Sequence, residues 1–503
     1  MSNTVLSLGV VGAYLLLLAA IGFWSYRHSG QDPVSYFLAG RGLGSLALTL
    51  TTLATLLSAF TFIGVPADAY THGLGIFLGV GVTTAFISGL FLWVGYRVWL
   101  AAQHFGFITP SEFFGHRFNS PLLALLYCLS ALTFTAPYIS IQIIGGARTL
   151  AAVLGEGIPY WPLAVVVALV ILAYVLFGGS QAVVWTDVVQ GIILVLGMGV
   201  ALVAVALRWG QEAGSQLDPW LSLPGPQGRW SWQTLLGNQL LFFMATPLFP
   251  QFFQRFYMAK SARPFQTLMV VWPLLILLVF FPAALIGVWG RLAFPELQQP
   301  DQVMPLMLQS LPSGVAAVVI TAALAALMST ADSQLLTASS LVTRDLVVTF
   351  LKRPLSPHQE ELLGRGVVLG IGLVSFAIAV RPPGLIAQIA TWSFQGYAML
   401  FPILMAGLYW KRATRAGAVA GALVSSSLTL GWLSGLLPKA WTGGWLPVIP
   451  AVVIGTAVLV GVSLLTQPDQ ERVAAYYENG PWAGEGCSAS AGSQPLENQE
   501  GAA

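Results

Sequence analysis

Long apolar stretches alternate with short polar connections over most of the sequence. The apolar stretches recur between residue 4 and residue 466. Each has about 18 residues or more, which is enough to cross a hydrocarbon core of about 30 Å as a helix. Lipid offers the backbone no hydrogen-bond partner, so helices are expected. Gly, Pro and charged residues divide the stretches into about thirteen predicted spans: 4–26, 44–68, 72–99, 120–153, 160–178, 182–209, 233–258, 265–293, 309–346, 361–381, 384–410, 414–437 and 444–466.

Composition agrees with a membrane protein. Hydrophobic residues make up 56% of the chain and charged residues 8%, whereas soluble domains carry roughly 25% charged residues. We therefore predict an all-α integral membrane protein whose surroundings are a lipid bilayer. The net charge is +2 and the basic residues form no stripe, so we expect no nucleic-acid partner, and no obligate protein partner is inferred.

The distribution of Lys and Arg predicts the topology. With the N-terminus placed outside, fifteen of these residues, Arg255 among them, fall in loops assigned to the cytoplasm and five in outside loops, while Arg148 lies at a span end. Such a bias is typical of cytoplasmic loops. We expect a multi-pass protein of a bacterial inner (plasma) membrane with a cytoplasmic C-terminus. The first stretch is expected to be a retained span, because it has no basic leader or cleavage pattern.

Two regions are expected along the chain. Residues 1–466 form the transmembrane domain. Residues 467–503 are polar and rich in Gly, Ser, Glu and Ala, which predicts a disordered cytoplasmic tail.

Enzyme motifs are absent from the sequence. The cysteines are Cys128 and Cys487, no histidine belongs to a His-Glu-x-x-His arrangement, and no phosphate-binding loop occurs. We therefore predict a protein that is not an enzyme and has no organic cofactor. Without a nucleotide site, transport would be driven by an ion gradient.

Polar residues inside the predicted spans are the candidates for chemistry. Asp187 lies early in the sixth span, and Asp332 lies in the oxygen-rich stretch 325–334 of the ninth. Ser329, Asp332 and Ser333 share one helix face. Hydroxyl and carbonyl oxygens suit a hard cation such as sodium. The alternative is that these hydroxyls bond only to their own helix.

Two further spans contain residues that disturb a helix. The second span, over 50–66, is dense in Thr and Ser, includes Ser58, and ends at Gly64 and Pro66, which favours an interruption. Its alternative role is a seam of small residues between helices. The seventh span carries Pro247 and Pro250, which must disturb the backbone hydrogen bonds. Because the two spans lie five positions apart in the order of spans, we predict a five-plus-five inverted repeat over about 44–209 and 233–410.

Three motifs resemble those of the sodium:solute symporter family, which includes proline, pantothenate, monocarboxylate and sodium/glucose carriers. They are the stretch 327–336 followed by Ser339 and Ser340, the run Phe177-Gly178-Gly179 leading to Asp187 and Gln190, and the run 40–44. The resemblance covers roughly residues 5–465. It implies thirteen spans with a LeuT-like inverted-repeat core.

The resemblance also implies binding sites. A sodium ion, the coupling ion, would be bound by backbone carbonyls of Ala54, Leu57 and Ala326 and by hydroxyls of Ser329 and Thr330. The substrate cavity would include Tyr138, Gln142, Phe242, Thr246 and Pro250, and a packing role is the alternative for each of these. Asp187, Asp332 and Ser58 are further candidate functional residues.

The substrate prediction rests on local differences. Proline-type carriers place an acidic residue where this chain has Leu56, whereas the run 58–64 and the pair Ile141-Gln142 are more similar to pantothenate and monocarboxylate carriers. We predict a sodium-coupled symporter that imports a small organic solute, such as one of these organic acids. Proline, another amino acid or a sugar is an alternative substrate. A sodium-independent facilitator or channel, a transporter-like sensor, and coupling to protons are alternatives of other kinds.

Overall fold

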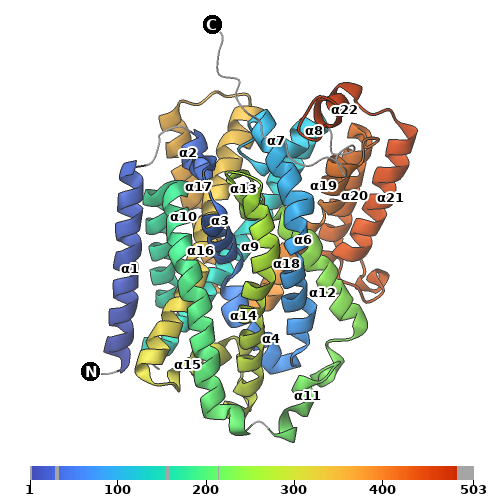
Figure 1. The fold of residues 1–503 in the computed structure, drawn as a ribbon. Coiled ribbons are helices and arrows are strands. Elements are labelled where there is room, and N and C mark those ends of the chain that lie inside the picture. Colours follow the sequence, from blue (N-terminus) through green and yellow to red (C-terminus); the bar gives the residue numbers. More distant parts are fainter. Residues whose placement is uncertain (1–2, 29–32, 155–158, 213, 484–503) are drawn as a thin grey trace.

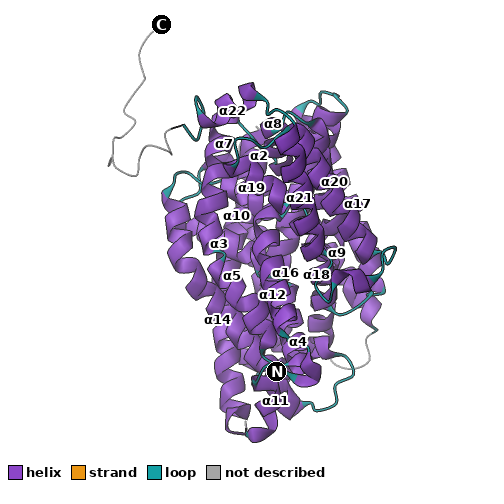
Figure 2. Cartoon of the chain, turned by 90° about the vertical axis from the view of Figure 1, so that its right-hand side faces the viewer, coloured by secondary structure: helices purple, strands orange, loops and turns teal. Residues whose placement is uncertain are grey.

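The structure is a computed structural model, which describes residues 3–28, 33–154, 159–212 and 214–483. All its regular elements in these ranges are helical (Figure 2). The helices that matter below are α1 (Asn3–His28), α3 (Ser45–Leu56), η2 (Phe60–Gly64), α4 (Val65–His72), α7 (Arg97–Phe105), α8 (Pro110–Arg117), α9 (Pro121–Leu154), α10 (Tyr160–Trp209), α12 (Trp232–Ala245), η8 (Thr246–Leu248), α13 (Pro250–Tyr257), α14 (Arg263–Ala293), η9 (Pro300–Gln302), α15 (Val303–Gln309), α16 (Ser313–Ser340), η10 (Leu341–Phe350), α17 (Pro357–Val380), α18 (Ile386–Ala398), α19 (Phe401–Tyr409), α20 (Arg415–Leu433), α21 (Val448–Leu465) and α22 (Gln470–Tyr477).

The predicted number of thirteen spans is not confirmed. Among the described residues, ten helices are long and apolar enough to cross a membrane, and an eleventh span results if the bent pair 45–56 and 60–72 is counted as one. The predicted span 233–258 is divided into α12 and α13, which are each too short to cross. The predicted span 160–178 corresponds to a shorter apolar segment, Tyr160–Ala173, at the start of α10.

The two ends of the described chain lie at opposite ends of the helix bundle. In Figure 1, α1 begins at the lower end and α22 lies at the upper end, beside α7 and α8. Ends at opposite sides require the chain to cross the bundle an odd number of times. The side on which each end lies stays a prediction.

Helix α16 forms the centre of the bundle and is buried over most of its length. It packs against α1, α3, α9, α10 and α17. Two glycines of α10 allow a close approach: a Cβ on Gly197 would lie 2.2 Å from the Cβ of Ala322 in α16, and one on Gly191 would lie 3.0 Å from the Leu50 carbonyl oxygen in α3. Small residues therefore bring α3, α10 and α16 together where their polar residues lie.

The first part of the predicted disordered tail is helical. Asp469 caps α22 by accepting a hydrogen bond from the backbone N–H of Arg472 (3.2 Å). Tyr476 is fully buried, and its hydroxyl lies 2.9 Å from Nδ1 of His116 in α8. The buried Trp482 indole donates to the carbonyl of Arg97 (3.2 Å). The expectation of a disordered tail is wrong for this part, because a few aromatic residues in a polar segment find a docking surface that composition cannot reveal. Residues 484–503 lie outside the described residues.

Candidate functional site

The predicted interruption of the second span is present. Helix α3 ends at Leu56, and Leu57 has an extended backbone (φ −75°, ψ 107°). The chain then continues through the π-helical turn η2 into α4, with a bend of 56° between the two halves. Thr and Ser residues weaken the helix here, and the break leaves backbone groups without intrahelical partners.

Side chains from α9 form hydrogen bonds with the backbone and side-chain groups of the broken segment. Gln142 Oε1 accepts a hydrogen bond from the backbone N–H of Ala59 (2.9 Å), and the Tyr138 hydroxyl lies 3.0 Å from Ser58 Oγ. Ser58 Oγ also accepts from the backbone N–H of Phe60 (3.2 Å). Two residues predicted for the substrate cavity, Tyr138 and Gln142, thus hold the interruption in place.

The five residues predicted to bind sodium come together at this break. Ser329 Oγ lies 2.8 Å from the carbonyl oxygen of Ala54 and 3.0 Å from that of Ala326. Thr330 Oγ1 lies 3.3 Å from the carbonyl oxygen of Leu57 and 3.1 Å from that of Ala326. All five residues are fully buried.

One further oxygen belongs to this group. The carbonyl of Thr55 lies 3.2 Å from Thr330 Oγ1. The sequence reasoning missed it, although its position between Ala54 and Leu57 in the broken helix was a usable signal. We call the resulting set of buried carbonyl and hydroxyl oxygens the oxygen cluster. Such a set fits a hard monovalent cation.

Asp187 lies in a buried network beside the oxygen cluster. Its Oδ2 accepts hydrogen bonds from Thr51 Oγ1 (2.6 Å) and from the guanidinium of Arg255 (2.9 Å). Arg255 also donates to Ser333 Oγ (2.6 Å), which lies 3.1 Å from Thr55 Oγ1. The network therefore connects α3, α10, α13 and α16.

The assignment of Arg255 to a cytoplasmic loop was wrong. Arg255 belongs to α13 and is 1% exposed. Helix α13 follows the break at η8 and is buried in the bundle, where Asp187 compensates the charge of Arg255. A buried charge needs such a partner, and a count of basic residues along the chain cannot distinguish it from a loop residue.

Asp332 lies on the same face of α16 as Ser329 and Ser333 but does not join the oxygen cluster. It is fully buried, and neither carboxyl oxygen has a hydrogen-bond partner within the described part of the chain. Its position close to Asp187 and Tyr14 places it toward α10 and α1. A functional role for Asp332 stays a prediction.

The second predicted interruption is also present. Helix α12 ends at Ala245, and a short turn, η8, leads to α13, which begins at Pro250. The Thr246 hydroxyl bonds to the carbonyl of Phe242 in its own helix (2.7 Å). Phe242, Thr246 and Pro250 are all buried at this break.

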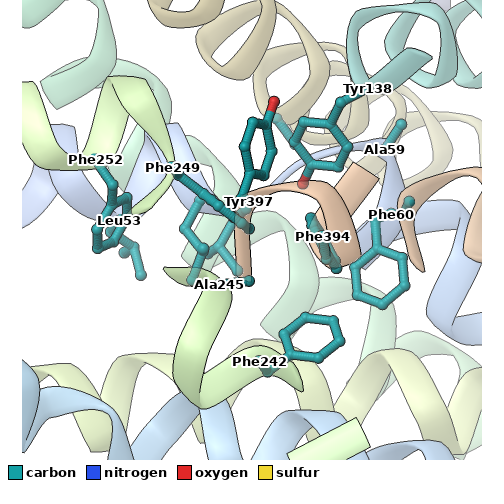
Figure 3. Close-up of a cluster of buried hydrophobic side chains, with 14 of the residues drawn as sticks. Leu53, Ala59, Phe60, Tyr138, Phe242, Ala245, Phe249, Phe252, Phe394 and Tyr397 are labelled. Carbon is teal, nitrogen blue, oxygen red and sulfur yellow. The ribbon is translucent and has the colours of Figure 1, made fainter. Parts of the chain in front are cut away.

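Aromatic rings fill the space between the two broken helices (Figure 3). Phe394 of α18 is their centre: its ring centroid lies 4.7 Å from that of Phe242, 5.0 Å from Phe249 and 5.1 Å from Tyr138. We call this the aromatic cluster; its members are Phe60, Tyr138, Phe242, Phe249, Phe394 and Tyr397.

Four members of the aromatic cluster were not predicted as site residues: Phe60, Phe249, Phe394 and Tyr397. Phe249 lies between Pro247 and Pro250, where the interruption itself was the signal. Phe394 and Tyr397 lie on α18, and nothing in their local sequence distinguishes them from other apolar positions. Of the five residues predicted for the substrate cavity, the structure brings Tyr138 and Phe242 into the cluster and places Gln142, Thr246 and Pro250 at the neighbouring breaks.

Two broken membrane helices beside a buried group of carbonyl and hydroxyl oxygens are typical of cation-coupled membrane carriers, which is the class of protein that this fold indicates. The model of the sodium:solute symporter family matches residues 36–425, and the chain belongs to this family. The family consists of sodium-coupled transporters, so the chain is a transmembrane symport protein and not an enzyme.

Characterised relatives cover most of the chain. A sodium/pantothenate symporter of Escherichia coli is 29% identical over 92% of this chain and 97% of its own length. A sodium/pantothenate symporter of Haemophilus influenzae is 27% identical over 83% of this chain and 89% of its own. A sodium/proline symporter of Staphylococcus aureus is 28% identical over 91% of this chain and 92% of its own.

A solved structure has the same fold. It is the substrate-bound outward-open state of a Na+-coupled sialic acid symporter, with a TM-score of 0.74 and 23% identity over 92% of this chain and 98% of that one. The predicted family and the all-helical membrane fold are therefore confirmed.

Proposed function

We propose that this protein is a sodium-coupled importer of a small organic solute, with the sodium ion bound between the break of α3 and helix α16. The observation that carries the proposal is the buried group of oxygens from Ala54, Leu57, Ala326, Ser329 and Thr330. Both hydroxyls can rotate so that their lone pairs face an ion. The carbonyl oxygens released by the break supply the remaining ligands.

Sodium would join two separate elements at this site. Ala54 and Leu57 belong to the broken α3, whereas Ala326, Ser329 and Thr330 belong to α16. An ion between them favours the arrangement in which both sets of oxygens lie within reach. Because a ligand shifts a conformational equilibrium by its differential affinity, sodium would stabilise an outward-open arrangement that accepts solute.

The solute would bind in the aromatic cluster between the two broken helices. The rings offer apolar surface, and the hydroxyls of Tyr138 and Ser58 offer hydrogen bonds at its edge. A carboxylate could accept from these hydroxyls. We therefore favour an organic acid such as pantothenate or a monocarboxylate. Proline is the second candidate, because the identities to the pantothenate and proline symporters are nearly equal.

Transport would follow alternating access. In this scheme the inverted repeats cover about 44–209 and 233–410 within thirteen spans. The N-terminus lies outside the cell, and one group of helices rocks against the other to release sodium and solute inside. The positions of the two breaks, five spans apart, support the repeat.

The test is uptake of radiolabelled pantothenate, pyruvate, acetate and proline into proteoliposomes. An inward sodium gradient should drive accumulation of one solute above equilibrium, and an equal potassium gradient is the control. Uptake that only equilibrates, and does so without sodium, would contradict the proposal and favour a facilitator. Binding of a solute without transport would favour a sensor.

A further inference from the structure

A groove of about 630 Å³ lies on the outside of the helix bundle, at the end where α22 packs. Three segments form it: the start of α9, the start of α20, and the connection from α21 to α22. Its lining residues are Asn119, Ser120, Leu122, Thr414, Arg415, Ala416, Val419, Ala420, Leu423, Thr466, Gln467, Pro468 and Asp469. None of them belongs to the sodium or solute sites described above.

The groove has a polar end and an apolar wall. Arg415 begins α20, and Leu423 follows two turns later, about 12 Å along the helix. Leu122 and Leu423 are 41% and 42% exposed, so this wall faces the surrounding lipid. Asn119, Arg415, Gln467 and Asp469 lie at the other end, where α9 and α20 begin and α21 has ended. This is the level of the membrane surface, and the shape suits an amphiphile.

The polar end holds one positive and one negative side chain. Neither Arg415 nor Asp469 takes part in an ion pair within the described ranges. Asp469 accepts hydrogen bonds from the Asn119 side chain (3.2 Å) and from the backbone N–H of Arg472. A carboxylate has about four acceptor positions, so it retains capacity for another donor.

The basic residues nearest in sequence are engaged elsewhere. Arg412 donates to the carbonyl of Leu464 (3.0 Å), and the Lys411 ammonium lies 5.5 Å from the centre of the Tyr477 ring. Arg472 lies 2.9 Å from Nε2 of His116. None of the three lines the groove. The charges that do line it are therefore balanced, which favours a zwitterionic headgroup over an anionic one.

We propose that this groove is a binding site for a phospholipid with an ethanolamine headgroup. The phosphate binds the guanidinium of Arg415, the primary ammonium donates to the carboxylate of Asp469, and an acyl chain lies along Leu122, Val419 and Leu423. The site also couples the lipid to α22, because Asp469 is the residue that caps that helix.

The test uses the purified full chain and native mass spectrometry after exchange into phosphatidylethanolamine, phosphatidylcholine or phosphatidylglycerol. The wild type should retain phosphatidylethanolamine in preference to the other two lipids. Arg415→Gln should lower retention at least about tenfold, as expected for a lost hydrogen bond to a charged group. Asp469→Asn should remove the preference for ethanolamine while it preserves the helix cap, because Asn is also a good cap.

Two further variants distinguish a loss of lipid retention at this groove from general effects on the protein. Ala420→Phe fills the groove and should also abolish retention. Arg381→Gln changes an exposed basic residue outside the groove, just after α17, and should change nothing. Equal retention by the wild type and Arg415→Gln would overturn the proposal. A preference for phosphatidylglycerol would also overturn it and would indicate an anionic-lipid site. Because lipid retention requires no transport, this result is independent of the proposed function.

Discussion

At the scale of residues, the core of this protein shows how polar groups are tolerated inside a membrane. The hydroxyls of Ser329 and Thr330 have oxygen partners at the α3 break, and Arg255 has Asp187. Unpaired polar groups would cost several kcal/mol in hydrocarbon. The polar residues are therefore grouped, and the groups coincide with the places where the backbone is interrupted.

The proposed sodium site makes a prediction about matched threonines on α16. Thr330→Ala should raise the sodium concentration for half-maximal transport at least about tenfold, because it removes an ion ligand. Thr321→Ala is the control, since among the described residues the Thr321 hydroxyl bonds only to the carbonyl of Ala317 in its own helix (2.8 Å). The measurement is sodium-dependent uptake in proteoliposomes. Equal sodium dependence of the two variants would count against the site.

The buried ion pair makes a prediction about stability. Asp187→Asn should lower the free energy of unfolding by about 3–5 kcal/mol, because it leaves the guanidinium of Arg255 buried without its counter-charge. Thermal unfolding in detergent measures this effect. The exposed Asp218→Asn is the control, and the double variant Asp187→Asn/Arg255→Gln should recover part of the loss. No difference between Asp187→Asn and Asp218→Asn would show that the pair is not required.

At the scale of elements, two short helices, α13 and α22, position buried side chains. Helices α13 and α22 have eight residues each, too few to be stable alone in water. Tertiary contacts hold them in place: α13 through Arg255 and its aromatic residues, and α22 through Tyr476 and the nearby Trp482. Local propensity therefore says little about either.

The packing of α22 against His116 predicts how the stability of the protein depends on pH. Partial burial, followed by the positive charges of Arg472 and His104, lowers the pKa of His116 to about 4. In the unfolded chain the pKa is about 6.5, so the native state binds fewer protons between these values. The stability contributed by neutral His116 is fully present above pH 6.5 and is lost as pH falls toward 4. Thermal unfolding should thus show a steeper loss of stability over this range in the wild type than in His116→Gln. Parallel pH profiles would refute this assignment.

At the scale of the whole molecule, a buried ion pair lies at the end of the bundle opposite α22. Arg148 of α9 pairs with Asp301 of η9, and Asp301 Oδ2 also accepts from the backbone N–H of Ile386 at the start of α18 (3.2 Å). Burial raises the pKa of Asp301, and Arg148 opposes this effect. The pair therefore joins three segments at this end: α9, η9 and the start of α18.

Breaking this pair should favour opening at that end. Arg148→Gln should increase the labelling rate of a cysteine introduced at Phe394 by a membrane-impermeant maleimide several-fold, since a change of about 1.4 kcal/mol shifts an equilibrium tenfold. The background chain carries serine at Cys128 and Cys487. Arg381→Gln is the control, because Arg381 is exposed and forms no ion pair among the described residues. Unchanged labelling in Arg148→Gln would show that the pair does not hold this end closed.

Much of the architecture could be predicted from the sequence, because hydrocarbon imposes a simple rule. Apolar length marks the helices, and the Ser, Thr and Pro residues at 50–66 and 242–251 mark the two breaks, both of which are present. The number of spans stays a prediction, because length alone does not show that α12 and α13 are separate short helices or that the apolar segment Tyr160–Ala173 is shorter than a span.

The residues that meet at the break of α3 could also be predicted in large part. The family resemblance implies Ala54, Leu57, Ala326, Ser329 and Thr330, and the structure brings these five residues together. Only the tertiary structure decided what lies across from them. Arg255 reaches Asp187, Phe394 lies at the centre of the aromatic cluster, and α22 docks on α8, in each case through contacts between residues far apart in the chain. Such contacts depend on how helices pack, and the local pattern of polar and apolar residues does not encode which distant partner each side chain meets.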